Sequence, residues 1–159
     1  MKPLPKHMRP RWRYLAVSIR TWPDASLSRR SFQQACWSAA RGLLGDVGSA
    51  RLDLGVYGFE HADTVAEAVV RTSHQTVPEA RAVLACVTHV DGAAVGVRVR
   101  GVSGTVKSCE EKYLGRRPED LREIQVVFDN DQRQAVVRDG LADIRTDGSF
   151  VGATTLDFE

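Results

Sequence analysis

The stretch RWRYLAVSIRT (residues 11–21) decides the fold, because both faces of the strand that it predicts are able to pack. Successive side chains of a β-strand point to opposite sides of the sheet. One face carries the aliphatic residues Leu15, Val17 and Ile19. The other carries aromatic and small residues: Trp12, Tyr14, Ala16 and Ser18. A strand with two usable faces favours a sheet that is covered on both sides.

The elements that follow this strand alternate between helical and strand-like spacing. A helix is predicted between a cap at Ser28 and Gly45. Its apolar stripe is Phe32, Cys36, Ala39 and Leu43, and we expect Leu15, Val17 and Ile19 to face it. Residues 50–59 and 65–73 predict two strands joined by a hairpin at 61–63. A second helix begins near Pro78, and residues 94–100 predict a fourth strand.

The order strand, helix, strand, strand, helix, strand predicts an α+β fold of the ferredoxin-like or RRM-like type, with an antiparallel sheet and helices packed on it. A third helix from Gly104 to Leu114 is expected on the second face of the sheet. We divide the chain into a flexible basic arm (1–10), rich in proline, an RRM-like domain (11–117) and an acidic C-terminal extension (118–159). In the extension, β-like pieces at 124–128, 134–138 and 141–145 predict a short β-rich region.

Composition places the chain among globular proteins, with 43% hydrophobic and 26% charged residues. No run of about 18 apolar residues and no signal core is present, so we expect a cytoplasmic protein without membrane association. Charge is uneven: residues 1–45 carry nine Lys or Arg and one acid, whereas residues 118–159 carry four Arg and ten acids. The basic end suggests an anionic partner, although a solvated charged face is the simpler explanation.

No catalytic or metal-binding constellation is evident. The four histidines, His7, His61, His74 and His89, lack partners at metal-site spacing, and the three cysteines suggest reduced, mostly buried residues. Adjacent Glu110 and Glu111 are expected to pair with Lys107, and residues 129–131 to form a turn rather than a calcium loop. We therefore expect no catalytic residue, no metal and no bound cofactor in this chain.

The segment RVRGVSGTVKSCEEKYLGRR (residues 98–117) is the richest in possible RNA-binding chemistry. Two arginines on a strand lead through a hydroxyl-rich turn to a helix start, where N–H groups favour phosphate oxygens. Local chemistry alone favours a role for Ser103 as the helix cap, and a cap is also able to face a phosphate. Trp12 and Tyr14 are open to two interpretations, base stacking or burial under the third helix. We predict RNA contacts at the arm and at this turn, through Lys2, Lys6, Arg9, Arg11, Arg13, Arg98, Arg100, Ser103, Gly104, Thr105 and Lys107. Arg138, in the acidic extension, is expected to lie outside this surface.

Four stretches resemble a known family: LPKHMRPRWRYLAV (4–17), CWSAARGLLGDVGSA (36–50), EAVVRTSH (67–74) and GVSGTVKSCEEKYLG (101–115). The chain is similar to the archaeal ribonuclease P protein component 2 family, with its eukaryotic counterparts in ribonuclease P and the ribonucleoprotein MRP. The resemblance implies an RRM-like subunit of the ribonuclease P endoribonuclease holoenzyme. Such a subunit binds and activates a catalytic RNA that removes the 5′ leader of precursor tRNA.

The resemblance also implies the partners. These are the ribonuclease P RNA, precursor tRNA indirectly, and a TIM-barrel protein subunit in a heterotetramer with two copies of each protein; Mg²⁺ is then used by the RNA. The resemblance leaves the acidic extension unexplained. Two alternatives stay open: an RRM-like protein of another ribonucleoprotein, although EAVVRTSH lacks the stacking aromatics of an RRM, and a ferredoxin-like enzyme acting on a small molecule.

Overall fold

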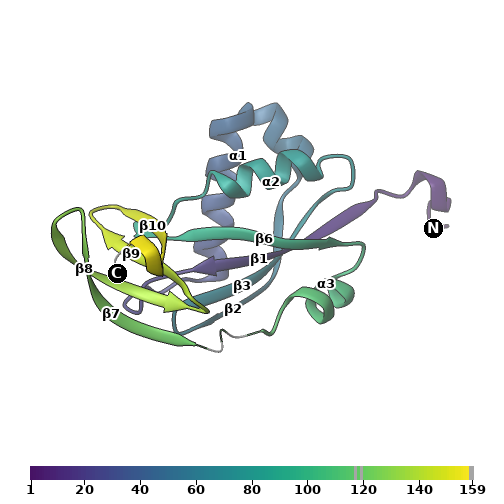
Figure 1. The fold of residues 1–159 in the computed structure, drawn as a ribbon. Helices are drawn as coiled ribbons and strands as arrows, with labels where there is room; N and C mark the ends of the chain where they lie inside the picture. The colour runs from purple at the N-terminus through teal and green to yellow at the C-terminus, as the bar shows by residue number, and fades with distance from the viewer. Residues whose placement is uncertain (117, 119, 158–159) are drawn as a thin grey trace.

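A computed structural model describes residues 1–116, 118 and 120–157. The described residues form two four-stranded antiparallel sheets, a short two-stranded hairpin and three α-helices (Figure 1). The predicted boundary between the domain and the extension falls at residue 117, which lies outside the described residues, as do the last two residues of the chain.

The core sheet has the strand order β2-β3-β1-β6. Its strands are β1 (Trp12–Arg20), β2 (Gly55–Ala62), β3 (Val65–Ser73) and β6 (Gly96–Ser103). Every neighbouring pair is antiparallel, and β1 lies in the centre, bonded to both β3 and β6. This arrangement confirms the predicted ferredoxin-like α+β class. The hairpin of β4 (His89–Val90) and β5 (Ala93–Ala94) precedes β6 and turns at Asp91 and Gly92, both with positive φ.

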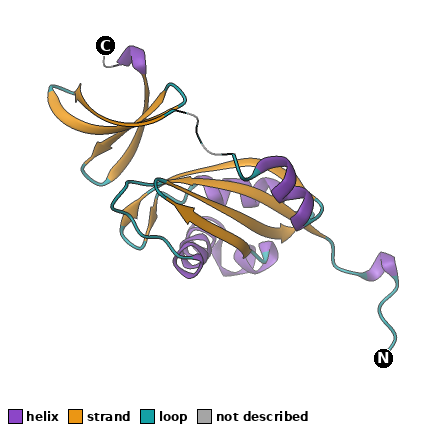
Figure 2. Ribbon diagram, turned by 90° about the horizontal axis from the view of Figure 1, so that it is seen from below, coloured by secondary structure: helices purple, strands orange, loops and turns teal. Residues whose placement is uncertain are grey.

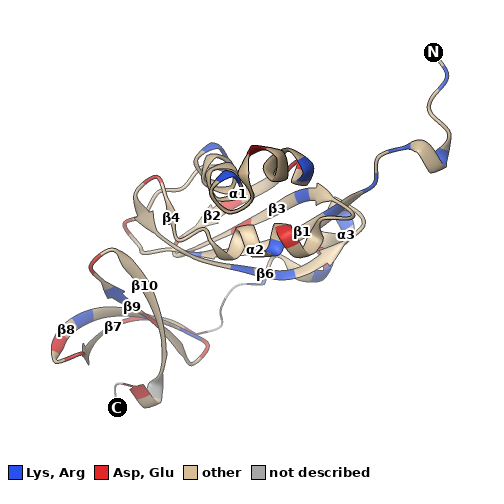
Figure 3. Cartoon of the chain, turned by 90° about the horizontal axis from the view of Figure 1, so that it is seen from above, with Lys and Arg blue, Asp and Glu red and all other residues tan. Residues whose placement is uncertain are grey.

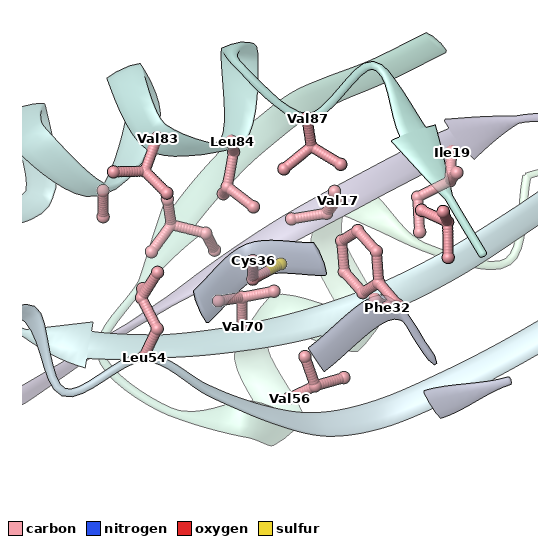
Figure 4. Packing of buried hydrophobic residues seen from close by; sticks show 14 of the residues in the cluster. Val17, Ile19, Phe32, Cys36, Leu54, Val56, Val70, Val83, Leu84 and Val87 are labelled. Carbon is pink, nitrogen blue, oxygen red and sulfur yellow. The ribbon is translucent and has the colours of Figure 1, made fainter. Parts of the chain in front are cut away.

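Two helices, α1 (Arg29–Leu52) and α2 (Val77–Ala85), cover one face of the core sheet (Figure 1). Leu15, Val17 and Ile19 are fully buried there against Phe32 and Cys36 of α1, as predicted (Figure 4). Leu43 was expected in the same stripe but is 48% exposed. Ala40 and Leu44 pack inward instead, because the buried stripe drifts around the helix over successive turns.

The sequence misplaced the end of α1 and the start of β2. Ser28 caps α1 as predicted, in a reciprocal capping arrangement with Ser31. At Gly45 the backbone leaves the helical region (φ 71°, ψ 179°), but a second helical piece continues to Leu52. Leu52 is buried at a helix end and Leu54 is buried in the connection that follows, so their apparent alternation does not come from one strand. The predicted strand 50–59 therefore begins later, at Gly55.

The third helix, α3 (Val106–Tyr113), packs on the opposite face of the core sheet, as predicted (Figure 1). Its buried residue Cys109 lies against Ala16 of β1 and Val69 of β3, with Tyr14 and Tyr113 at the margin of the cluster. The ring of Tyr113 lies over Gly101, where an added Cβ would stand 2.3 Å from a ring carbon. A glycine at position 101 is thus required for this close approach.

The C-terminal sheet consists of β7 (Leu121–Phe128), β8 (Asp131–Arg138), β9 (Leu141–Thr146) and β10 (Ser149–Thr154) in an antiparallel meander. The first three strands contain the predicted β-like pieces, and β7 and β8 begin three residues earlier than predicted, whereas β10 was not predicted. A 3-10 turn, Thr155–Asp157, follows β10. The sheet lies at the end of the core sheet away from the N-terminal arm (Figures 1 and 2).

A buried ionic cluster joins the C-terminal sheet to the core. Asp143 of β9, with its side chain 2% exposed, accepts a hydrogen bond of 2.6 Å from Arg20 at the end of β1 and pairs with Arg138 of β8. Arg138 also donates to the carbonyl oxygens of Thr21 and Thr64, each at 3.0 Å. Burial raises the pKa of Asp143, and the two adjacent guanidiniums oppose that shift.

Candidate nucleic-acid interface

The basic charges of the N-terminal arm lie at the end of the molecule opposite the acidic C-terminal sheet (Figure 3). All residues from Met1 to Arg11 are exposed. Three prolines argued against regular structure in the arm, yet Lys6–Met8 form one 3-10 turn. Arg9 folds back on the arm and donates from Nε to the Leu4 carbonyl at 2.8 Å, whereas Arg13, on β1, is half-buried.

Strand register brings the root of the arm beside the start of α3. Tyr14 pairs with Ser103 across β1 and β6. This register brings two distant groups of predicted contact residues to one end of the core sheet. One group is Arg11 and Arg13, and the other runs from Ser103 to Lys107. This convergence depends on β1 lying between β3 and β6, which a local sequence pattern does not reveal.

The turn before α3 has its hydroxyl groups arranged differently from the prediction. The helix starts at Val106, and its N-cap is Thr105, whose side chain accepts from the Ser108 N–H at 3.1 Å. Ser103 is instead the last residue of β6, so the proposed capping role for Ser103 is wrong. Gly104, Thr105 and Lys107 are exposed at the helix start, and Lys107 lies 3.8 Å from Glu111 one turn later, the pairing expected for these charges.

Arg98 and Arg100 are exposed on β6 but are displaced from the helix start. Arg98 pairs with Ser18, so it lies five residues, about 16 Å of strand, from Ser103. Arg100 occupies a β-bulge, because Ala16 pairs with Gly101 and Val17 with Val99. The predicted contacts thus form two groups: one at the arm end of the sheet, and one along the exposed edge strand β6 (Figure 3).

Arg138, which was expected to lie outside the RNA surface, is buried and is therefore unsuitable as a reference residue. Its side chain is 7% exposed and is held in the ionic cluster described above. Burial lowers the pKa of Arg138, and the neighbouring Asp143 carboxylate opposes that shift. Arg122 of β7, with its side chain 61% exposed, is the better reference for the acidic extension.

The sequence also missed Arg71 and Tyr57, which lie near the arm end. The Arg71 guanidinium stands 3.8 Å from the centre of the Trp12 ring. Tyr57 is 50% exposed beside it. Strand alternation places Arg71 on the α3 face, but nothing in the local sequence marks it as a partner of Trp12, which lies 59 positions earlier in the printed sequence.

The histidines were expected to be structural or on the surface, and the cysteines to be reduced and mostly buried. His61 accepts from the Leu27 N–H through Nδ1 and contacts the Thr21 hydroxyl through Nε2, which ties the β2 end to the core. Cys36 and Cys109 are buried as expected, and burial raises their thiol pKa values to about 12 and about 11; Cys86 is exposed. Across residues 1–116, 118 and 120–157, no group of three or more His, Cys, Asp or Glu side chains is arranged to hold a metal ion.

An antiparallel sheet with two helices on one face and a third on the other defines an α+β fold of the RRM-like class. Comparison with known proteins identifies the family to which this chain belongs. The sequence model of the Rpp14/Pop5 family matches residues 13–114, and the chain belongs to this family. None of the helices in the described residues is long and apolar enough to cross a membrane.

Two relatives that are similar in sequence agree with this assignment. Ribonuclease P protein component 2 of Halorubrum lacusprofundi is 54% identical over 159 residues, covering all of both chains. The protein of the same name from Methanosarcina mazei is 38% identical over 114 residues, covering 72% of this chain and 93% of that one. A chain in the structure of yeast ribonuclease MRP is also similar, with a TM-score of 0.47 and 18% identity over 63% of this chain and 79% of that one. The C-terminal sheet lies beyond the family match.

Proposed function

We propose that this chain is a protein subunit of ribonuclease P that binds the catalytic RNA and supports removal of the 5′ leader from precursor tRNA. Family membership carries the proposal, together with relatives named as ribonuclease P components. In this proposal the RNA performs the cleavage and uses the Mg²⁺, and the chain supplies no catalytic residue. Its task is to neutralise phosphates and so lower the repulsion that opposes folding of the RNA.

Reconstitution tests this function directly. Cognate RNA, this chain and its TIM-barrel partner are combined, and precursor tRNA cleavage is followed as Mg²⁺ is varied. The proteins should lower the Mg²⁺ concentration that the RNA requires, and the chain alone should leave precursor tRNA intact. Cleavage without RNA that survives rigorous nuclease removal would overturn the proposal.

The RNA surface in this proposal is the arm end of the core sheet together with the exposed arginines of the edge strand β6. Charge distribution supports it, because the exposed arm cations adjoin the start of α3 and the acidic sheet lies at the opposite end (Figure 3). Each phosphate contact that is lost should reduce the logarithmic salt slope of binding by about 0.7 to 0.9. Lys107→Ala and Arg100→Ala should each show this reduction.

Arg122→Ala is the matched control, since Arg122 is exposed in the acidic sheet. Its salt slope should equal that of the unmodified protein, and thermal unfolding confirms that all three variants are folded. Equal slopes in all of them would remove Lys107 and Arg100 from the RNA surface.

We further propose that α1 contributes to the surface for the TIM-barrel subunit in a heterotetramer with two copies of each protein. Trp37, Leu43 and Val47 are 42%, 48% and 78% exposed on this helix. Exposed apolar side chains grouped on one element are typical of a surface that a partner covers. Co-purification and light scattering with the partner test the assembly and its stoichiometry.

A further inference from the structure

Trp12, Arg71 and Tyr57 form an aromatic platform at the arm end of the core sheet. The guanidinium carbon of Arg71 lies 3.8 Å from the centre of the Trp12 ring and 5.0 Å from the centre of the Tyr57 ring. Tyr14 meets Tyr57 edge-on, with ring centres 6.1 Å apart and planes at 88°. Three strands thus contribute to one cluster: β1, β2 and β3.

Tyr57 owes its position to the backbone of β2. Val56 pairs with Val70 and Gly58 pairs with Val69, so Tyr57 is the extra residue of a β-bulge. A bulge re-aims a side chain and is frequent beside functional sites. Val56 is buried in the core, whereas the Tyr57 ring is half-exposed. At Gly55 an added Cβ would stand 3.2 Å from this ring, so a larger residue there would displace Tyr57.

The two aromatic residues of β1 that were open to two interpretations differ in their surroundings. Tyr14 packs against the cluster beneath α3 and serves as a core residue. Trp12 is half-buried and stacks on Arg71. The positively charged guanidinium lies near both rings and makes the platform attractive to an electron-rich planar ligand.

Neighbouring charges indicate which ligand fits. The exposed cations of the arm adjoin Trp12 in the sequence and favour a polyanion. Asp53 lies 3.6 Å from Arg71 and offsets part of its charge, which favours stacking over a phosphate contact at the platform itself. Farther along the same face, Glu60, Glu67 and Glu110 line a hollow, so a polyanion is expected to run from the platform toward the arm.

We propose that an unpaired nucleobase of RNA stacks on the exposed ring of Tyr57, with Arg71 and Trp12 behind it. This inference rests on the proposed function and names the part of the RNA that is bound: a single-stranded nucleotide rather than a helix backbone. Base stacking on aromatic rings tolerates any sequence, because every base has a π-face. The platform therefore contributes affinity for unpaired RNA without base selectivity.

Two probes separate stacking from phosphate binding: a short single-stranded oligouridine, and an abasic ribose-phosphate strand of equal length. The full chain should bind oligouridine about 5- to 150-fold more tightly than the abasic strand, the range that loss of one stacking contact produces. Tyr57→Leu should abolish this preference while keeping the salt slope. Tyr57→Phe retains the ring and should retain the preference.

The outcomes distinguish the two proposals. Equal binding of both strands by the unmodified protein, or a preference that survives Tyr57→Leu in folded protein, overturns the stacking site and leaves the phosphate surface intact. The stacking site is also overturned if Tyr57→Leu impairs binding of the protein partner instead of binding of RNA. If neither strand binds, the stacking site is wrong, and binding of the cognate RNA in the same buffer decides whether the proposed function also fails.

Discussion

Removal of the Asp143 carboxylate should destabilise the attachment of the C-terminal sheet to the core. Asp143→Ala leaves two guanidiniums without their shared anion. The Arg20 side chain is 36% exposed and is able to regain water, so the loss of its ion pair costs little stability. The Arg138 side chain is 7% exposed and cannot regain water, so its charge stays buried without the carboxylate. Breaking a buried ion pair on one side typically costs about 3–5 kcal/mol.

The lower part of that range is expected here. Arg138 keeps its two hydrogen bonds to the carbonyl oxygens of Thr21 and Thr64, which solvate the charge in part. We therefore predict a loss of about 3 kcal/mol in the free energy of unfolding, a large fraction of the roughly 5–15 kcal/mol of a typical domain. The double variant Arg138→Met with Asp143→Leu leaves neither charge of the pair and should regain most of this loss.

Chemical denaturation followed by tryptophan fluorescence measures the effect. Trp22 is 4% exposed, and its ring centre lies 4.5 Å from that of Phe150 in β10, so Trp22 reports on the docked sheet. Asp147→Ala is the control, because that side chain is fully exposed in the same sheet, and it should change stability by less than about 0.5 kcal/mol. The reasoning fails if Asp143→Ala matches Asp147→Ala, or if the double variant is no more stable than Asp143→Ala.

Three further predictions follow from burial and charge. In native protein, a thiol reagent at neutral pH should modify the exposed Cys86 rapidly, whereas Cys36 and Cys109 should react only after unfolding, as mass spectrometry would show; rapid modification of all three would contradict their burial. Val47→Glu should abolish co-purification with the TIM-barrel subunit while changing the stability of the free chain by about 0.5 kcal/mol or less, and retained binding would move the partner surface off α1. The hydrogen bond from Arg145 lowers the pKa of Asp24 below its ordinary 3.8. The ionised carboxylate therefore stabilises the fold above pH 3.8, and this contribution is lost as the pH falls through the lowered pKa. In Asp24→Asn the free energy of unfolding should fall less steeply than in the unmodified protein as the pH drops below about 4.

Local periodicity was sufficient to predict most of the elements. Alternation along residues 11–21 predicted a central strand with two packed faces, and β1 has α1 on one face and α3 on the other. The predicted cap at Ser28 is also correct, because it depends on the chemistry of a few adjacent residues. The second piece of α1 was missed because Leu52 and Leu54 match a strand pattern equally well.

Features that depend on distant residues were decided by the tertiary structure alone. Arg138 has the sequence context of an exposed strand residue, yet Asp143 and two carbonyl oxygens of the core enclose it. The platform needs a bulge at Tyr57 and a register that brings Arg71 to Trp12. The sequence by itself determined most of the elements, their order, the uneven charge and the family resemblance, since these follow from adjacent residues or from composition. Which charge is buried and which aromatic ring remains exposed depends on the packing of distant segments, and no local pattern encodes that packing.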